Sequence, residues 1–408
     1  MTLLIQIAWR NLWRNPKRSM LLISAIVVCI ASLIITLAWI NGMLNQMVQN
    51  SIEFHIGEME IYQKGFREDN DPSNYISDET QLLSYLESNK NVRASAPRVE
   101  GRGLVSSSYS SSGVQITGID AEKEGDITLV KRSVIGGRYL DSSEGHDILI
   151  GRKMADKLQV GIGDKVVLTV QTIRKELASD AFRIVGIYST ISNDFDKYMV
   201  YIPIERSRSI LGLEKGITGL ALRIDDEETL EEVKADVNRK FGKNGMEALT
   251  WGDLEPLLKD MVDISKQWTL LFFLAVFIVL SIGIINTQNI AVYERMHELG
   301  VLKAMGTKPL FIFSMIMLET CFLAILGLSA GLIITYPLIF YFSTEGLNLA
   351  IFAEGLQLWG MGSRIYLDLG VIDIVYSSIS VIITAFFGAL LPSIRASRLE
   401  PVKAIRYV

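Results

Sequence analysis

The sequence predicts an α-helical membrane protein with four transmembrane helices and a large α+β extracytoplasmic (periplasmic) domain inserted between helices 1 and 2. Three observations predict this fold class. Four long apolar stretches occur in the 408-residue chain, one long polar stretch separates the first from the second, and basic residues gather beside particular apolar stretches. A hydrophobic content of 49% with 21% charged residues fits a chain that is part membrane and part soluble.

The four apolar stretches are long enough to cross a bilayer. Met20–Ile40 has no charged residue and would be about 31 Å long as a helix, which matches the hydrocarbon thickness of a membrane. A cleaved signal peptide is the alternative for this stretch, but its length and the lack of a small-x-small site after Trp39 favour an uncleaved span. The other stretches are Trp268–Ile285, Leu310–Phe342 and Ile374–Leu391.

Lysine and arginine in the short connections predict the orientation. The segments before the first span, between the second and third, and after the fourth are rich in these cations, whereas the segment between the third and fourth holds only Arg364. The positive-inside rule therefore places both termini in the cytoplasm and the insert outside it, in a multi-pass protein of the inner (cytoplasmic) membrane.

The elements follow in a defined order along the chain. Ile5, Ala8 and Leu12 recur at helical spacing beside Trp9 and Trp13, which predicts a helix lying in the membrane interface. The predicted order is a cytoplasmic interfacial helix (1–18), transmembrane helix 1 (19–41), an extracytoplasmic α+β domain with stalk helices (42–266), transmembrane helix 2 (267–291), a cytoplasmic coupling helix (292–309), transmembrane helix 3 (310–342), a short extracytoplasmic segment (343–370), transmembrane helix 4 (371–391) and a cytoplasmic tail (392–408).

Helical periodicity continues beyond the membrane at both ends of the insert. Met43 and Met47 carry an apolar stripe past the first span, and Leu258 and Met261 carry another into the second. We therefore predict stalk helices that join spans one and two to the insert. Methionine is flexible and polarizable, so these four residues are candidates for contacting an acyl chain; the alternative is that they only pack one stalk against the other.

The insert itself is predicted to be α+β. Alternating apolar residues between turn signals predict strands, and apolar residues at 3–4 spacing predict helices. The predicted strands are Glu58–Gln63, Arg98–Ser106, Val114–Ile119, Ile148–Ile150, Lys165–Thr172, Phe182–Ile187, Met199–Ile202 and Leu220–Ile224. The predicted helices are Asp78–Ser88, Arg152–Lys157, Ile204–Leu211 and Glu227–Phe241.

The segment Tyr293–Gly306 is charged and helix-favouring, and it lies between two apolar stretches. Arg295 and Glu298 are three residues apart and are expected to pair along one helix edge. Met296, Leu299, Leu302 and Met305 form an apolar stripe of the kind that fits a groove on a partner protein. The alternative is a plain membrane-surface loop, which any four-span protein needs.

Glu319 is the one acidic residue inside the third apolar stretch. It would lie about 14 Å into the span by helical rise, where an unpaired carboxylate costs roughly 2.5–3.5 kcal/mol. We expect it to face protein or water and to cap a helix contact rather than to relay protons. Gly327 and Gly331 have the small-x-x-x-small spacing that lets two helices approach closely.

Two segments resemble the FtsX-like/MacB-like permease superfamily of ABC transporters. They are the 293–306 segment and the tail Leu391–Tyr407, and the family also has an acidic residue at the place of Glu319. The resemblance implies a mechanotransmission permease whose ATPase-coupling residues are Glu294, Arg295, Glu298, Leu299, Gly300, Leu302, Lys303, Ala304 and Gly306. It also implies an ABC ATPase subunit dimer that carries the ATP and Mg²⁺, and a second permease subunit, identical or paralogous.

Phrases in the insert resemble lipoprotein-releasing (Lol-type, LolC/LolE) permeases. They include Gly118–Asp120, Ile148–Leu158, Gly161–Lys165 and Asp196–Ile204. This resemblance implies a lipoprotein cargo taken from the membrane and, in some members, a periplasmic carrier chaperone that docks on a long arm. Here Val170–Ala181 leaves room only for a short hairpin. MacB-like export of drugs, peptides or other amphiphiles, and FtsX-like regulation of an extracellular hydrolase, remain the alternatives.

Nothing in the sequence predicts chemistry on this chain. It has no Gly-x-x-x-x-Gly-Lys-Ser/Thr loop to hold nucleotide phosphates, and its three histidines form no metal-binding motif. The net charge of −5 and the absence of a basic stripe argue against nucleic acid. We therefore predict a transporter subunit that is not an enzyme, has no catalytic residue or metal, and binds no cofactor itself.

Overall fold

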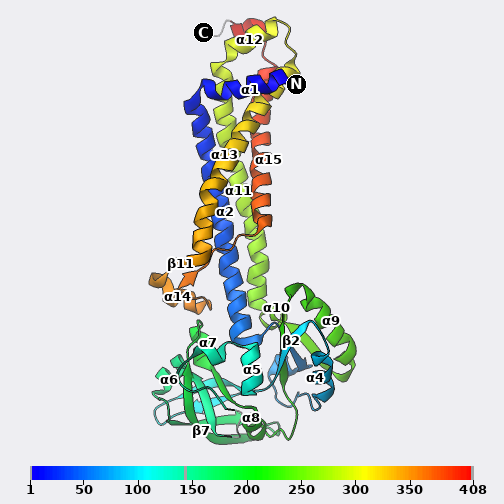
Figure 1. The fold of residues 1–408 in the computed structure, drawn as a ribbon, viewed down its shortest axis with the longest axis vertical. Coiled ribbons are helices and arrows are strands. Elements are labelled where there is room, and N and C mark those ends of the chain that lie inside the picture. Colours follow the sequence, from blue (N-terminus) through cyan, green and yellow to red (C-terminus); the bar gives the residue numbers. More distant parts are fainter. Residues whose placement is uncertain (1, 142–144, 406–408) are drawn as a thin grey trace. The chain divides into compact units, whose positions relative to one another are not determined.

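The computed structural model describes residues 2–141 and 145–405. The chain divides into two compact units. One is helical and comprises residues 1–44, 262–347 and 365–408; the other contains the large sheet and comprises residues 45–261 and 348–364. Figure 1 shows the elements of both.

The helical unit is built on four long apolar helices, each long and apolar enough to cross a membrane (Figure 1). They are α2 (Pro16–Ser51), α11 (Pro256–Glu294), α13 (Pro309–Glu345) and α15 (Val371–Ser397). Each contains one of the four apolar stretches found in the sequence. Proline opens three of them, at a position where its missing N–H would have no helical partner anyway. The shorter helices are α1 (Thr2–Arg14), α12 (Met296–Ala304) and α16 (Pro401–Ile405).

Glycines set the closest approach between these helices. A β-carbon at Gly327 would lie 2.7 Å from the Ile26 β-carbon, and one at Gly331 would lie 2.1 Å from Ile30 Cγ2. The glycine pair of α13 therefore receives the branched side chains of α2, which is the role expected of small-x-x-x-small spacing. Gly388 of α15 meets Ile284 of α11 in the same manner, at 3.0 Å.

The second unit is organised around a mixed ten-stranded sheet. The strand order is β10–β1–β9–β2–β3–β8–β5–β7–β4, and β6 pairs with β2 and β7. The pairs β3–β8 and β5–β7 are parallel, and the other pairs are antiparallel. The strands are β1 (Met59–Gln63), β2 (Val92–Ser106), β3 (Ser111–Ile119), β4 (Val134–Gly137), β5 (Asp147–Gly151), β6 (Lys165–Gln171), β7 (Leu177–Tyr188), β8 (Met199–Pro203), β9 (Gly219–Ile224) and β10 (Met246–Thr250).

The main core of this unit contains alternate residues of these strands, packed against short helices. Ile61, Val99 and Leu220, from neighbouring strands, are all fully buried in it. The helices around it are α4 (Thr80–Glu87), α6 (Arg152–Leu158), α8 (Ile204–Leu211) and α9 (Leu230–Phe241). Since period-2 alternation and 3–4 spacing both report burial on one face, the sequence patterns located most of these elements within three residues, but β2 and β7 begin at Val92 and Leu177, earlier than the predicted Arg98 and Phe182.

Several elements escaped the sequence patterns. The strands β4 and β10 and the short helices α5 (Ala121–Ile127) and α7 (Asn193–Tyr198) were not expected. The five residues Ile52–Ile56 form a π-helical turn, η1, directly after α2.

The segment 170–181 is a tight hairpin, as the sequence analysis expected. Val170 pairs with Ala178 and Gln171 with Leu177, and the turn closes where the Thr172 N–H donates to the Glu176 carbonyl at 2.8 Å. Lys175 takes a positive φ of 62° within this turn. No long arm branches from the sheet at this point.

We predict that Gly331→Ala weakens the helical unit. The new methyl group would overlap Ile30 Cγ2, and overpacking of this kind costs about 1–3 kcal/mol. The thermal midpoint of the purified protein in detergent measures the loss. Gly283→Ala on α11 is the matched control, because no heavy atom lies within 4 Å of the position that its β-carbon would take. Equal midpoints for the two variants would contradict the proposed contact.

Candidate functional sites

The segment between α11 and α13 forms a separate short helix with a defined stop. Arg295 breaks the helical path after Glu294, and α12 then runs from Met296 to Ala304. Gly306 has a φ of +92°; its N–H donates to the Lys303 carbonyl at 3.0 Å, and the next N–H donates to the Leu302 carbonyl at 3.1 Å. This is the Schellman arrangement, which requires a left-handed residue and favours glycine.

A buried ion-pair network braces this segment. Glu319 of α13 is 1% exposed, and its two carboxylate oxygens accept from different arginines: Oε2 from Arg295 Nη1 at 2.9 Å and Oε1 from Arg18 Nη2 at 3.1 Å. Arg18 also contacts Glu294 at 3.3 Å, and Arg295 Nη2 donates to the Asn11 carbonyl at 3.4 Å. One carboxylate thus joins α13, the start of α2 and the junction before α12.

The structure corrects two expectations about this segment. Arg295 does not pair with Glu298: it lies before α12 rather than within it, so its guanidinium reaches Glu319, while Glu298 pairs with Arg14 at 2.8 Å. The expected apolar stripe is only partly free for a partner, because Met305 is exposed but two of its residues are not. Leu299 is buried in the chain's own core beside Ile312 and Ala396, and Met296 is also buried.

A different face of α12 is open to solvent. Val301 and Met305 are exposed apolar residues on it, and Glu298, Ala304 and Gly306 are exposed beside them. The remaining expected coupling residues hold the helix in place. Lys303 donates to the carbonyls of Ser397 and Leu399 at 2.9 and 2.6 Å, at the end of α15, and Arg295, Leu299 and Gly300 are buried.

The ion-pair partners of this site were not predicted from the sequence. Among the basic residues before the first span, Arg14 and Arg18 indicated the orientation, and Arg14 was also placed on the polar face of the interfacial helix; in the structure Arg14 pairs with Glu298 and Arg18 with Glu319. The sequence did contain a signal for these ion pairs. A carboxylate at membrane depth needs a cation, and the arginines that flank the spans are the nearest cations in an antiparallel bundle.

We predict that Glu319→Gln destabilises the helical unit by about 3–5 kcal/mol, because it leaves the buried Arg295 guanidinium without a counter-charge and leaves Arg18 with Glu294 alone. Glu298→Gln is the matched control: its ion pair with Arg14 is about half exposed on both sides, so its loss should cost less than about 1 kcal/mol. Thermal unfolding in detergent compares the two, and equal stability of both variants would refute the bracing role.

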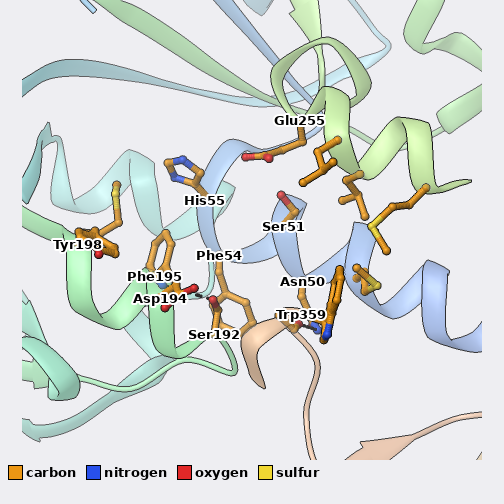
Figure 2. A pocket seen from close by; sticks show the side chains of 16 residues that line it. Asn50, Ser51, Phe54, His55, Ser192, Asp194, Phe195, Tyr198, Glu255 and Trp359 are labelled. Atoms are coloured by element: carbon orange, nitrogen blue, oxygen red, sulfur yellow. Dashed lines mark hydrogen bonds between the residues drawn. The ribbon is translucent and has the colours of Figure 1, made fainter. Parts of the chain in front are cut away.

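The sheet unit contains a cavity of about 420 Å³ (Figure 2). Its walls come from the end of α2, the turn η1, helix α7, the start of α11 and the segment after α14 (Ala353–Leu358). Figure 2 shows Phe54, Phe195 and Trp359 on its walls. The lining residues are Met47, Asn50, Ser51, Phe54, His55, Ser192, Asp194, Phe195, Tyr198, Met199, Glu255, Leu257, Leu258, Met261, Trp359 and Gly360.

Three of the four stalk residues named from the sequence line this cavity. They are Met47, Leu258 and Met261; Met43 does not line it. The aromatic residues were missed, because they stand on a π-turn, a six-residue helix and a loop that have no helical periodicity. Two hydrogen bonds hold the loop that carries Trp359: Asn50 Nδ2 donates to the Gly360 carbonyl at 2.8 Å, and Asn193 Nδ2 donates to Gln357 Oε1 at 2.5 Å.

The charged groups of the cavity are acidic. Asp194 and Glu255 line it, and its described lining contains no lysine or arginine. Figure 2 shows the Glu255 carboxylate turned toward the side of the cavity where His55 lies. Burial raises the pKa of Glu255, and the positive charge of Arg67 opposes that rise.

A second buried polar cluster lies on β1 and β2, around Arg98. This guanidinium is 2% exposed and donates to Glu60 at 2.5 Å, to both oxygens of Glu124 at 2.6 and 3.1 Å, and to the His55 carbonyl at 2.7 Å. The strand β9 lies between β1 and β2 and places the small residues Ala221 and Gly219 beside Glu60 and Arg98. The longer side chains of β1 and β2 can therefore meet over β9. The cluster ties η1 to the sheet through the His55 carbonyl.

Burial raises the pKa of Glu60 to about 7. Loss of solvation is the largest cause, and the charge of Glu100 raises the pKa further, so that together they outweigh the lowering effect of Arg98. Glu60 is therefore protonated in the folded state at a pH where it is ionised in the unfolded chain. The stability that this proton contributes is fully present below about pH 4.5 and is lost as the pH rises through about 7.

We predict that Glu60→Gln removes this dependence. Relative to the variant, the wild-type protein should lose stability between pH 5 and 8, by at most about 1.4 kcal/mol per pH unit. Thermal unfolding of the full chain, followed by near-ultraviolet circular dichroism, measures the difference. Glu176→Gln on the exposed hairpin is the control. Parallel pH profiles for wild type and Glu60→Gln would rule the titration out.

Among residues 2–141 and 145–405, no group of three or more histidine, cysteine, aspartate or glutamate side chains is placed to hold a metal ion.

Comparison with known proteins matches both parts of the chain. Residues 19–240 match the family described as the MacB-like periplasmic core domain, and residues 270–401 match the FtsX-like permease C-terminal family. The lipoprotein-releasing system transmembrane protein LolC of Neisseria meningitidis is 22% identical over 405 residues, which cover 95% of this chain and 94% of that protein.

Two further relatives extend the comparison. LolC of Buchnera aphidicola is 24% identical over 414 residues, covering 98% of each chain. The macrolide export ATP-binding/permease protein MacB of Wolinella succinogenes is 22% identical over 419 residues, covering 98% of this chain and 60% of that protein.

Proposed function

Because this chain belongs to the MacB-like and FtsX-like family of ABC-transporter permeases, we propose that it is the membrane subunit of a transporter that releases lipoproteins from the inner membrane toward the outer membrane. The family is one of multi-pass inner-membrane permeases that work with an ATPase partner. In this proposal the ATPase subunits form a dimer that binds the ATP and Mg²⁺, and a second permease subunit, identical or paralogous, stands beside this one.

The observation that carries the proposal is the braced α12. Its exposed face presents Val301 and Met305, while Arg295 and Glu319 fix its start to the transmembrane helices. A push on the exposed face of α12 would also move the transmembrane helices. Separating Arg295 from Glu319 would instead leave an uncompensated buried charge, which is unfavourable. In this mechanism Glu294, Glu298, Ala304 and Gly306 meet the ATPase, and Leu299, Gly300, Leu302 and Lys303 hold α12 in place.

The proposal also fixes the topology. Both termini and α12 would face the cytoplasm, where the ATPase lies, and the sheet unit would face the periplasm. The basic residues that flank the spans support this orientation. The bounds of α2 and α11 cross the division between the two units, so each helix has residues in both. These two helices are therefore the candidates for carrying motion from the membrane to the sheet unit.

The cargo assignment rests on the LolC relatives, which align over nearly the whole chain. Met47, Leu258 and Met261 would contact the acyl chains in the cavity, with Met43 farther along the same helix. The hairpin at 170–181 lacks an arm for a carrier chaperone, so any chaperone would dock through a second permease or on another surface. The alternative function, export of another amphiphile, is favoured by the match to MacB over 98% of this chain.

Release of a lipoprotein from proteoliposomes tests the proposal. Proteoliposomes that contain this chain, its ATPase and its paired permease should release an acylated lipoprotein only with hydrolysable ATP. Absence of release despite intact ATPase binding would refute the lipoprotein assignment and leave the permease assignment standing.

We predict that Glu298→Gln and Gly300→Leu separate ATP hydrolysis from release. Glu298 lies on the exposed face of α12, so its change should not prevent assembly through the other contacts. Gly300 is buried, so a leucine there should displace α12 from the helices that hold it. The ratio of lipoprotein released to ATP hydrolysed should fall at least tenfold in each variant. Glu176→Gln, on the hairpin of the sheet unit, should keep the wild-type ratio. Wild-type ratios in both α12 variants would contradict a coupling role.

A further inference from the structure

We propose that the cavity of the sheet unit is a binding site for a cationic amphiphile, an alkyl chain that ends in an amine or quaternary ammonium group. The inference deepens the proposed function, on which it rests for the idea that this chain handles amphiphiles. It adds the charge of the headgroup, which neither the family nor its relatives' names specify.

The apolar part of the cavity suits one alkyl chain. Ligand pockets are typically about 300–1,000 Å³, and this one, at about 420 Å³, lies near the lower end of that range. Met47, Leu258 and Met261 supply one wall, and thioether side chains adapt to chains of different shape.

The charges of the cavity select the headgroup. Glu255 and Asp194 are its ionisable acids, and none of the described lining residues is lysine or arginine. Asp194 has a cation nearby, since Lys197 lies 3.1 Å away on the exposed side of α7. Glu255 has no ion pair within 4.0 Å among the described residues, although Arg67 influences it from a distance. An anionic headgroup would meet two like charges here, whereas a cation would complement the carboxylate of Glu255.

Four aromatic rings reinforce this selection. Phe54, Phe195, Tyr198 and Trp359 line the same cavity as the two carboxylates. Aromatic faces attract ammonium groups within about 6 Å, and cages of such rings are a common way to recognise quaternary ammonium ligands. Figure 2 shows Phe54, Asp194 and Phe195 grouped on one side of the cavity, with Trp359 on another wall. The loop of Trp359 is held by the hydrogen bonds of Asn50 and Asn193, so this wall is preformed.

The test compares headgroups on one chain length. The full-length protein in phosphatidylcholine nanodiscs is titrated calorimetrically with octyltrimethylammonium, octyl sulfate and octyl glucoside below their micelle-forming concentrations, and empty nanodiscs are subtracted. We expect the cation to bind at least tenfold more tightly than the anion, with the neutral glucoside between them. Equal affinity for cation and anion would overturn the inference, whatever the variants show.

Variants locate the effect. Glu255→Gln should remove most of the preference for the cation, and Asp194→Asn should remove less of it. Trp359→Ala should weaken binding of the cation more than binding of the anion or the glucoside. Glu176→Gln, an exposed acid outside the cavity, is the control for the loss of one negative charge. A full cation preference that persists in the Glu255→Gln, Asp194→Asn double variant would place binding elsewhere and refute the site.

The outcome separates this inference from the proposed function. Cation selectivity with no lipoprotein release would refute only the lipoprotein assignment. Normal release with no cation selectivity would refute only the headgroup assignment.

Discussion

The helical unit depends on neutralising one carboxylate. Glu319 is 1% exposed in an apolar helix, and hydrocarbon offers no water to solvate it, so the fold must supply the counter-charge. Arg18 and Arg295 supply it from two different elements, one at the start of α2 and one in the junction before α12. That single requirement determines where α11 must end, how α12 begins and which end of α2 lies beside α13. The close contact at Gly327 and Gly331 then sets the separation of α2 and α13 farther along.

The sheet unit also contains buried carboxylates that pair with an arginine. Arg98 gathers Glu60 and Glu124 and the carbonyl of His55, all beneath the surface, on a patch where β9 contributes only small residues. A buried network of this kind contributes little net stability but penalises any arrangement that separates its members. It therefore fixes the turn η1 to β1 and β2. The aromatic and acidic cavity stands next to this turn, because His55 and Phe54 belong to both features.

We propose different roles for the two candidate sites: a contact with the ATPase and a contact with a ligand. The exposed face of α12 presents the apolar residues Val301 and Met305, which suits the proposed contact with a partner. The cavity has an apolar wall, acidic groups and aromatic rings, as expected of a surface that holds a ligand. In the proposed mechanism the energy source, the moving segment and the ligand contact lie on different elements.

The sequence by itself determined the four apolar helices, the mixed α+β character of the polar stretch, the short hairpin and the short helix between the second and third apolar helices. These follow from local properties: apolar length, periodicity and turn residues are all read within a few residues. Only the tertiary structure decided the partners. Arg295 pairs with Glu319 rather than Glu298, Leu299 lies inside the core, and Phe195 and Trp359 join Met47 around one cavity. These contacts link residues far apart in the chain, and a single sequence has no local pattern that reports them.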